Sequence, residues 1–325
     1  PAMTPSADLL DNLRCAPVLC FARGILARVL RSDLRLPDAL SQALSVYLLL
    51  AIGLKGGAAL SVGTPGLLAG VIATLAVAVT IPLVTFAAAR RVARFDRGSA
   101  ASLAAHYGST SAVTFLATLA YLEAMRAPVE GFLTALLAVM EVPAILIALL
   151  LAGGSGPDRR GDTLREVLTG KTLVLLLGGM VVGALAGHDG HRAVAPFFVH
   201  PFQGVLCLFL LDLGRVAAER LGDLGRQARF LVPFGLVAPV VFGSLGTLAG
   251  HLAGLSPGGA TALGALSGSA SYIAAPAAMR TALPETNHGP ALTASLGVTF
   301  PFNLLFGIPL LHALALQLAG GGTAS

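Results

Sequence analysis

Two short polar runs interrupt apolar stretches of the chain, and each has the residue types that could bind ions. They read Gly108-Ser109-Thr110-Ser111 and Gly268-Ser269-Ala270-Ser271. Each lies inside an apolar segment of about 25 residues, which is long enough to cross a bilayer. A helix broken at such a run exposes N–H groups at its new N-terminus, which suit an anion. It also exposes carbonyl oxygens at its new C-terminus, which together with hydroxyls suit a hard cation such as Na⁺.

The glycines indicate where the broken helices should end. We expect new N-termini at 109–112 and 269–272, and exposed carbonyl oxygens at 105–107 and 265–267. Pro276 favours a real break in the second segment, because proline removes a backbone donor. The alternative is that the serines and glycines serve only close helix packing, with each hydroxyl bonded back to its own helix.

Glu141 lies near the centre of another apolar segment, 128–152, in Met140-Glu141-Val142-Pro143. A carboxylate without a partner in hydrocarbon costs roughly 2.5 kcal/mol or more, so such residues usually face an ion path or a partner. We favour a cation site for Glu141 over a purely structural hydrogen bond. Its counterpart in the second half is Val298-Thr299-Phe300-Pro301 followed by Asn303, where the proline is placed to free a carbonyl oxygen.

An enzymatic interpretation finds little support. The one candidate pair of a nucleophile and a base is Ser109 with the nearby His106. The chain has neither a Gly-x-Ser-x-Gly elbow nor a His-Glu-x-x-His metal pattern. His106 and Tyr107, next to the first polar run, could instead line a substrate cavity, or His106 could only hydrogen-bond a neighbouring helix. We therefore expect a protein that is not an enzyme.

The composition predicts an all-α integral membrane protein. The chain has 325 residues, of which 55% are hydrophobic and 11% charged, whereas about a quarter of the residues of a soluble domain are charged. Its apolar segments are long and carry few internal charges, which favours helices over the alternating strands of a barrel. The three cysteines form no metal or disulfide pattern. We expect no cofactor, and no nucleic-acid partner despite the net charge of +5.

We expect ten transmembrane helices in two units of five: 1–152 forms a first repeat, 153–166 a linker and 167–325 a second repeat. Arginines concentrate in alternate connections and in the linker, which predicts that the linker is cytoplasmic and that both termini are periplasmic or extracellular. An odd number of spans per repeat inverts the second unit, so the broken fourth and ninth spans would meet near the midplane. The expected spans are 7–30, 37–60, 64–90, 98–124, 128–152, 168–187, 197–220, 229–254, 258–283 and 288–318.

Identical residues support the duplication. The segment from Gly98 matches the segment from Gly258 without a gap, and the two Gly-Ser-x-Ser runs coincide in that alignment, 160 positions apart. Sequence this rich in Ala, Gly and Leu also matches itself by accident, so an accidental match is the alternative.

The chain resembles the SbtA family of sodium-dependent bicarbonate transporters over nearly its whole length. Ile52-Gly53-Leu54-Lys55-Gly56-Gly57 is similar to the family's Ile-Gly-Leu-x-Gly-Gly, Gly108-Ser109-Thr110 to its Gly-Ser-Thr, and Met140-Glu141-Val142-Pro143-Ala144 to its Met-Asp-Ile-Pro-Ala. In the second half, Ser269-Ala270-Ser271-Tyr272-Ile273 with Pro276 and Arg280, then Leu283-Pro284-Glu285-Thr286-Asn287, follow its Ser-Ser-Ser-Asp-Ile, Pro, Arg and Ile-Pro-x-x-Asn.

The resemblance implies symport of Na⁺ and bicarbonate across the bacterial inner membrane. It also implies a homotrimer, a gate formed by spans 1, 2, 6 and 7, a core formed by the other six, and a PII-like cytoplasmic regulator as one further partner. The residues assigned to bicarbonate are Tyr107, Gly108, Ser109, Thr110, Ser269, Ala270, Ser271 and Tyr272. The residues assigned to Na⁺ are Glu141, Ser111, Ser267, Thr299 and Asn303.

Two tyrosines depart from the family pattern. Tyr272 stands where the family has Asp, and Tyr107 replaces a small serine before Gly-Ser-Thr. The lost acid bears on the sodium sites, and the larger side chains bear on the size of the cavity. Two alternatives therefore stay open: a symporter of the same fold for another small organic anion, and a sodium-independent anion channel.

Overall fold

The computed structural model describes residues 12–60, 64–153, 157–221 and 225–321, and within these ranges the chain is helical and has no β-strand. The first half contains α2 (Ala16–Val29), α3 (Asp38–Leu60), α4 (Leu67–Arg91), α5 (Arg97–Gly108), α6 (Ala112–Ala124), α7 (Leu133–Ala152) and α8 (Pro157–Leu168). The second half contains α9 (Lys171–Phe198), α10 (Phe202–Leu221), α11 (Ala228–Leu252), α12 (Pro257–Ser267), α13 (Ala274–Ala282), α14 (Gly289–Thr293), α15 (Phe300–Phe302) and α16 (Ile308–Gly321).

The helices are apolar enough for a membrane protein. Among the described residues, six stretches are long and apolar enough to cross a bilayer: Asp38–Leu60, Leu67–Arg91, Leu133–Ala152, Lys171–Phe198, Ala228–Leu252 and Gly289–Gly320. The prediction of an all-α, multi-pass membrane protein is therefore confirmed. The complete arrangement of ten spans in two inverted repeats stays a prediction.

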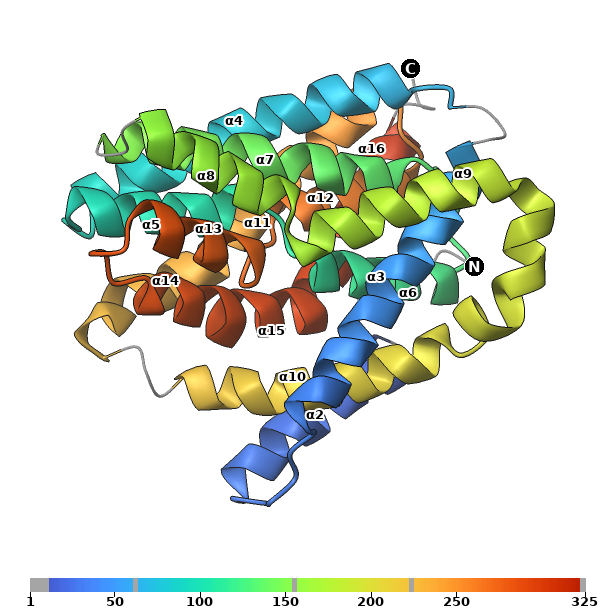
Figure 1. The fold of residues 1–325 in the computed structure, drawn as a ribbon, viewed down its shortest axis with the longest axis horizontal. Helices are drawn as coiled ribbons and strands as arrows, with labels where there is room; N and C mark the ends of the chain where they lie inside the picture. The colour runs from blue at the N-terminus through green and yellow to red at the C-terminus, as the bar shows by residue number, and fades with distance from the viewer. Residues whose placement is uncertain (1–11, 61–63, 154–156, 222–224, 322–325) are drawn as a thin grey trace.

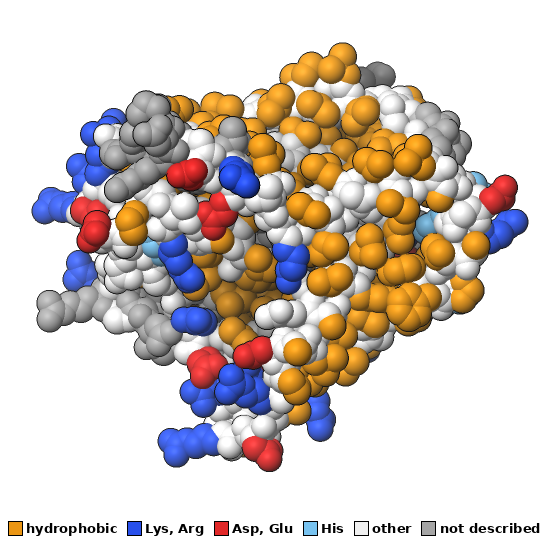
Figure 2. All heavy atoms as spheres, in the orientation of Figure 1, with side chains coloured by type: hydrophobic (Ala, Val, Ile, Leu, Met, Phe, Trp, Pro, Cys, Tyr) orange, Lys and Arg blue, Asp and Glu red, His pale blue; other side chains and the backbone are white. Residues whose placement is uncertain are grey.

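The surface agrees with this assignment. Figure 2 shows apolar side chains spread over much of the visible face, while Lys and Arg gather mainly at its left and lower edges. Leu68, Leu185 and Leu252 are each more than 70% exposed, at 74%, 83% and 76%. A soluble monomer rarely exposes a contiguous apolar surface of this kind, because burying it in lipid or protein is favourable.

The central segment, expected as a linker, contains a helix. α7 ends at Ala152, and Gly153 after it adopts the left-handed conformation (φ 71°), which glycine takes without steric cost. α8 then begins at Pro157, a residue that suits the first turn of a helix because its missing N–H has no partner there in any case. α8 packs against α13, so this connection lies beside one of the broken helices.

The helices pack as two groups. The four-helix group consists of α2, α3, α9 and α10, in which α3 lies along α9 and α2 along α10. The broken-helix group consists of α4 to α7 and α11 to α16, in which α4, α5 and α7 pack together and α12 packs on α11 and α16. Figure 1 shows the four-helix group on the right and lower side and the broken-helix group on the upper left.

Glycines allow the helices of the four-helix group to touch backbone to backbone. A Cβ on Gly183 of α9 would overlap the carbonyl oxygen of Leu54 in α3, and a Cβ on Gly24 of α2 would overlap that of Leu211 in α10. Small residues at the contact surface are the usual means of close packing between membrane helices. Close contact between the backbones therefore fixes the relative position of α3 and α9, and that of α2 and α10.

Two glycines of α9 provide a matched test of this packing. We expect Gly183→Ala to lower the free energy of unfolding by about 1–3 kcal/mol, because the new methyl group overlaps α3. Gly178→Ala should be neutral or slightly stabilising, by up to about 1 kcal/mol, because its Cβ meets no neighbouring atom and alanine favours the helix. Thermal unfolding of the purified proteins in one detergent measures both effects. Equal stability of the two variants would contradict the close contact of α3 with α9.

Candidate functional site

The first polar run separates α5 from α6. α5 ends at Gly108, the chain is extended at Ser109 (φ −86°, ψ 165°), and α6 begins at Ala112. Ser111 caps α6, because its Oγ accepts a hydrogen bond from the N–H of Thr114 at 3.1 Å. Gly108 sits against α4, where a Cβ would lie 2.8 Å from the Cβ of Pro82. The break therefore occurs where a small residue and a capping serine coincide.

The second polar run separates α12 from α13. α12 ends at Ser267, and the N–H of Gly268 still donates to the carbonyl oxygen of Gly264 at 2.8 Å. α13 begins at Ala274, just beyond the expected stretch 269–272. The Oγ of Ser271 accepts a hydrogen bond from the N–H of Ala275 at 3.1 Å. Ser271 therefore gives a partner to one N–H group in the first turn of α13, although it lies three residues before that helix begins.

Capping side chains also fix the outer starts of the two broken helices. Asp96 precedes α5 and accepts a hydrogen bond from the N–H of Ser99 at 2.9 Å. The pKa of the Asp96 carboxyl is lowered, mainly by the hydrogen bond from the Ser99 hydroxyl and then by the one from the Ser99 amide. Ser256 precedes α12 and accepts from the N–H of Gly259 at 3.0 Å. Glu130 in turn accepts from the N–H of Ser256 at 2.6 Å. Both broken helices thus begin at a polar cap.

The two breaks cross and bind each other. The Oγ of Ser269 accepts from the N–H of Ser111 at 2.9 Å and lies 3.2 Å from the Oγ1 of Thr110. The N–H of Ser271 donates to the carbonyl oxygen of His106 at 2.7 Å. All these residues are buried. Two runs that lie 160 positions apart in the sequence therefore form one polar centre inside the broken-helix group.

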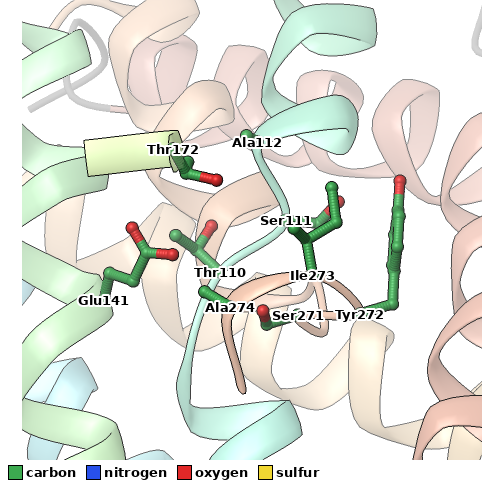
Figure 3. A pocket seen from close by; sticks show the side chains of 9 residues that line it. All are labelled: Thr110, Ser111, Ala112, Glu141, Thr172, Ser271, Tyr272, Ile273 and Ala274. Carbon is green, nitrogen blue, oxygen red and sulfur yellow. The ribbon is translucent and has the colours of Figure 1, made fainter. Parts of the chain in front are cut away.

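A narrow pocket opens beside this crossing. Figure 3 shows its lining side chains, with the carboxyl group of Glu141 directed toward Thr110. Five of the predicted site residues line it: Thr110, Ser111, Glu141, Ser271 and Tyr272. The other lining residues, which the sequence analysis did not assign, are Ala112, Thr172, Ile273 and Ala274.

Glu141 is buried without a complete set of partners. Its side chain belongs to α7, the residue is 2% exposed, and its Oε2 has no hydrogen-bond partner in the part of the chain that the structure describes. The hydroxyl of Ser109, in the break beside the pocket, also has no hydrogen-bond partner among the described residues. Because nearly all buried polar atoms in proteins are hydrogen-bonded, the unpartnered Oε2 of Glu141 at the pocket indicates a ligand or an ion.

Three of the remaining predicted residues, Tyr107, Thr299 and Asn303, form a second polar cluster. The hydroxyl groups of Tyr107 and Thr299 lie 2.7 Å apart, and Thr299 also donates to the carbonyl oxygen of Gly235 at 2.9 Å. The side-chain N–H of Asn303 donates to the carbonyl oxygen of Gly268 at 2.8 Å, and its Oδ1 has no partner among the described residues. This cluster adjoins the second break but does not line the pocket.

The predicted sodium ligands are therefore at two places. Glu141 and Ser111 line the pocket, whereas Thr299 and Asn303 belong to the second cluster. Ser267, in the last turn of α12, donates its hydroxyl to the carbonyl oxygen of Leu263 at 2.8 Å, a bond within its own helix. Of the predicted anion ligands, Gly108, Ser109, Ser269 and Ala270 lie in the breaks without lining the pocket.

One feature of the sequence could have indicated three of the four lining residues that the sequence analysis did not assign. Ala112, Ile273 and Ala274 directly adjoin the polar runs, and the N–H groups of a new helix start extend over its first turn. Thr172 had no such signal, because it lies at the start of α9, far from both runs in sequence. Only the packing of α9 against the broken-helix group places it at the pocket.

Ser269 allows a test of the crossing. We expect Ser269→Ala to lower the free energy of unfolding by about 1–3 kcal/mol, because the N–H of Ser111 loses its acceptor in a buried place. Ser295→Ala should cost less than about 1 kcal/mol, because that buried hydroxyl bonds only the carbonyl oxygen of Ala291 in its own helix. Thermal unfolding in detergent compares them. A Ser269→Ala protein as stable as Ser295→Ala would show that the breaks do not depend on this bond.

Comparison with known proteins gives an independent result. Residues 16–316 match the Na⁺-dependent bicarbonate transporter superfamily, whereas no curated protein matches the chain. The match covers both polar runs, Glu141 and all the helices from α2 to most of α16. It confirms the resemblance to sodium-dependent bicarbonate transporters and implies a transporter, not an enzyme. The chain belongs to the Na⁺-dependent bicarbonate transporter superfamily.

Proposed function

We propose that this protein is a symporter in which Na⁺ drives bicarbonate across the bacterial inner membrane. One observation carries the proposal: the starts of two half-helices, α6 and α13, meet at one pocket with an unpartnered buried carboxyl group. Such a pocket offers groups for an anion and for a cation at the same place. The family membership supports both ions.

The anion binds at the two helix starts. Ser111 and Ala112 bring the first turn of α6 to the pocket, and Ile273 and Ala274 bring that of α13. The first N–H groups of a helix have no partner within it, and the helix dipole places partial positive charge there. Bicarbonate therefore finds hydrogen-bond donors on two sides without an arginine among the described lining residues.

The cation binds at Glu141. Sodium is a hard ion that takes oxygen ligands, and the free Oε2 of Glu141 faces the pocket with the Thr110 and Ser111 side chains close by. The Oδ1 of Asn303, beside Thr299, offers a second place for a sodium ion. Binding of the cation beside the anion offsets the charge of each, and this links their transport.

The free space in the pocket is small. The cavity measures about 10 Å³, which is about the space that one buried water molecule needs. The pocket must therefore widen to admit bicarbonate, which has four heavy atoms, and a bulky organic anion would require a much larger change.

The two helix groups supply the moving parts. The four-helix group contains the expected spans 1, 2, 6 and 7 and serves as the gate, and the broken-helix group serves as the core that carries the ions. The two inverted repeats, divided by the segment around α8, relate the fourth and ninth spans. A homotrimer, termini outside the cell and a PII-like cytoplasmic regulator complete the proposal.

Uptake of labelled bicarbonate into proteoliposomes tests the function. We expect wild-type uptake to require an inward Na⁺ gradient. Ser109→Ala and Glu141→Ala should each lower kcat/KM by about tenfold or more, because Glu141 lines the pocket and the Ser109 hydroxyl is a buried, unpartnered group in the adjoining break. Ser295→Ala, which changes a buried hydroxyl outside the pocket, should transport as the wild type does.

Each other outcome has a separate meaning. Bicarbonate flux that follows the membrane potential and ignores Na⁺ would identify an anion channel. A folded protein that moves no bicarbonate would remove the substrate, and competition by other small carboxylates would then be measured. Full activity of Glu141→Ala would remove Glu141 from the coupled cation site.

A further inference from the structure

Thr172 lies at the pocket although it belongs to the other group of helices. It is the second residue of α9, whose N-terminal flanking residue Gly170 provides no side-chain cap. The residue is buried, at 7% exposure, and it lines the pocket opposite the broken helices. Figure 3 shows the Thr172 side chain above those of Thr110 and Glu141 in this view.

The other described lining residues come from the broken-helix group. They lie on the break between α5 and α6, on α7, and on the break between α12 and α13. Thr172 alone among them comes from the four-helix group, through α9, which packs along α3. The pocket is therefore closed on one side by a residue of the unit against which the core moves.

The Thr172 hydroxyl differs in its hydrogen bonding from the hydroxyl groups of the two breaks. The hydroxyl of Thr110 pairs with Ser269, and the Oγ atoms of Ser111 and Ser271 accept amide groups at the starts of their own half-helices. These groups are used by the fold. The Thr172 hydroxyl has no hydrogen bond to any described residue, which leaves it available to a ligand beside the free Oε2 of Glu141.

A second, larger cavity, of about 240 Å³, adjoins the pocket at the same place. It shares Glu141, Thr172, Ile273 and Ala274 with the pocket and extends past Lys171 to Glu166 in α8. A large cavity elsewhere, lined by Phe115, Lys55 and Glu123 among others, shares no lining residue with the pocket. Thr172 thus stands where the ion site joins the passage toward α8.

We propose that Thr172 is the contact that the four-helix group makes to the bound anion, and that this contact exists only while the site faces α8. The inference rests on the proposed function. The hydroxyl donates to a bicarbonate oxygen, and the positive end of α9 lies behind it. When the core moves to the other side, Thr172 stays with α9 and the anion leaves it. A contact made in one state alone gives that state the higher affinity.

Two substitutions at Thr172 test the proposal. Thr172→Val keeps the branched shape and removes the hydroxyl, and Thr172→Ser keeps the hydroxyl. We expect Thr172→Val to raise the KM for bicarbonate about tenfold when substrate is supplied at the α8 side, because a hydrogen bond to a charged group is lost. The KM at the opposite side should stay unchanged, and Thr172→Ser should behave as the wild type. Sodium-dependent initial rates in sealed vesicles of the two orientations measure both constants.

Thr74→Val is the matched control. Its hydroxyl is buried and bonds the carbonyl oxygen of Gly70 within α4 at 2.7 Å, away from the pocket. It should leave KM unchanged at both sides.

Four outcomes would overturn the proposal. An unchanged KM in Thr172→Val, or an equal loss in Thr172→Ser, would assign Thr172 to packing while the proposed function stands. An equal rise of KM at both sides would overturn the state dependence. A wild type without sodium-dependent uptake would overturn the proposed function, and this inference with it.

Discussion

The structure depends on the hydrogen bonds by which two broken helices satisfy each other. Hydrocarbon offers no water, so a helix that stops inside a membrane leaves costly unpaired N–H and carbonyl groups. Here Ser269 accepts the N–H of Ser111, and the carbonyl oxygen of His106 accepts the N–H of Ser271. Either break alone would leave these groups without partners. The two breaks are therefore stable only as a pair, and the pocket opens where they meet.

The same bonds explain why the molecule divides into two groups of helices. Because the breaks hold each other from both halves of the chain, the broken-helix group has an internal connection that side-chain packing alone would not give. The four-helix group is fixed differently, through glycines such as Gly24 and Gly183 that bring helix backbones into contact. Under the proposed function, these two units move against each other along the surface between them. The pocket lies at that surface, closed by Thr172 of α9.

The sequence predicted the parts of the site that depend on local chemistry. Gly-Ser runs inside apolar segments predicted interrupted helices, and the carboxyl of Glu141 in an apolar helix predicted a residue that faces a polar pocket. It could not predict the pairing of Tyr107 with Thr299, because a tyrosine beside a break has equal reason to face either way until the neighbouring helix is placed. The position of Thr172 at the pocket could not be predicted for the same reason. The helix α8 was missed because its polar, glycine-containing sequence carries the same signals as a loop.

Tyr272 shows how the pocket differs from the pattern of the resembling SbtA family, which has an acid there. The tyrosine ring packs edge to face on Phe300, with 5.7 Å between ring centroids, and lines the pocket. Glu141 is then the one acidic side chain among the described lining residues. Under the proposed function, a single sodium ion neutralises that carboxylate, and the helix starts of α6 and α13 balance the bicarbonate. A second sodium ion has only neutral oxygens available, such as the Oδ1 of Asn303, and would bind more weakly. Replacement of the acid by Tyr272 therefore favours coupling to one sodium ion at this pocket.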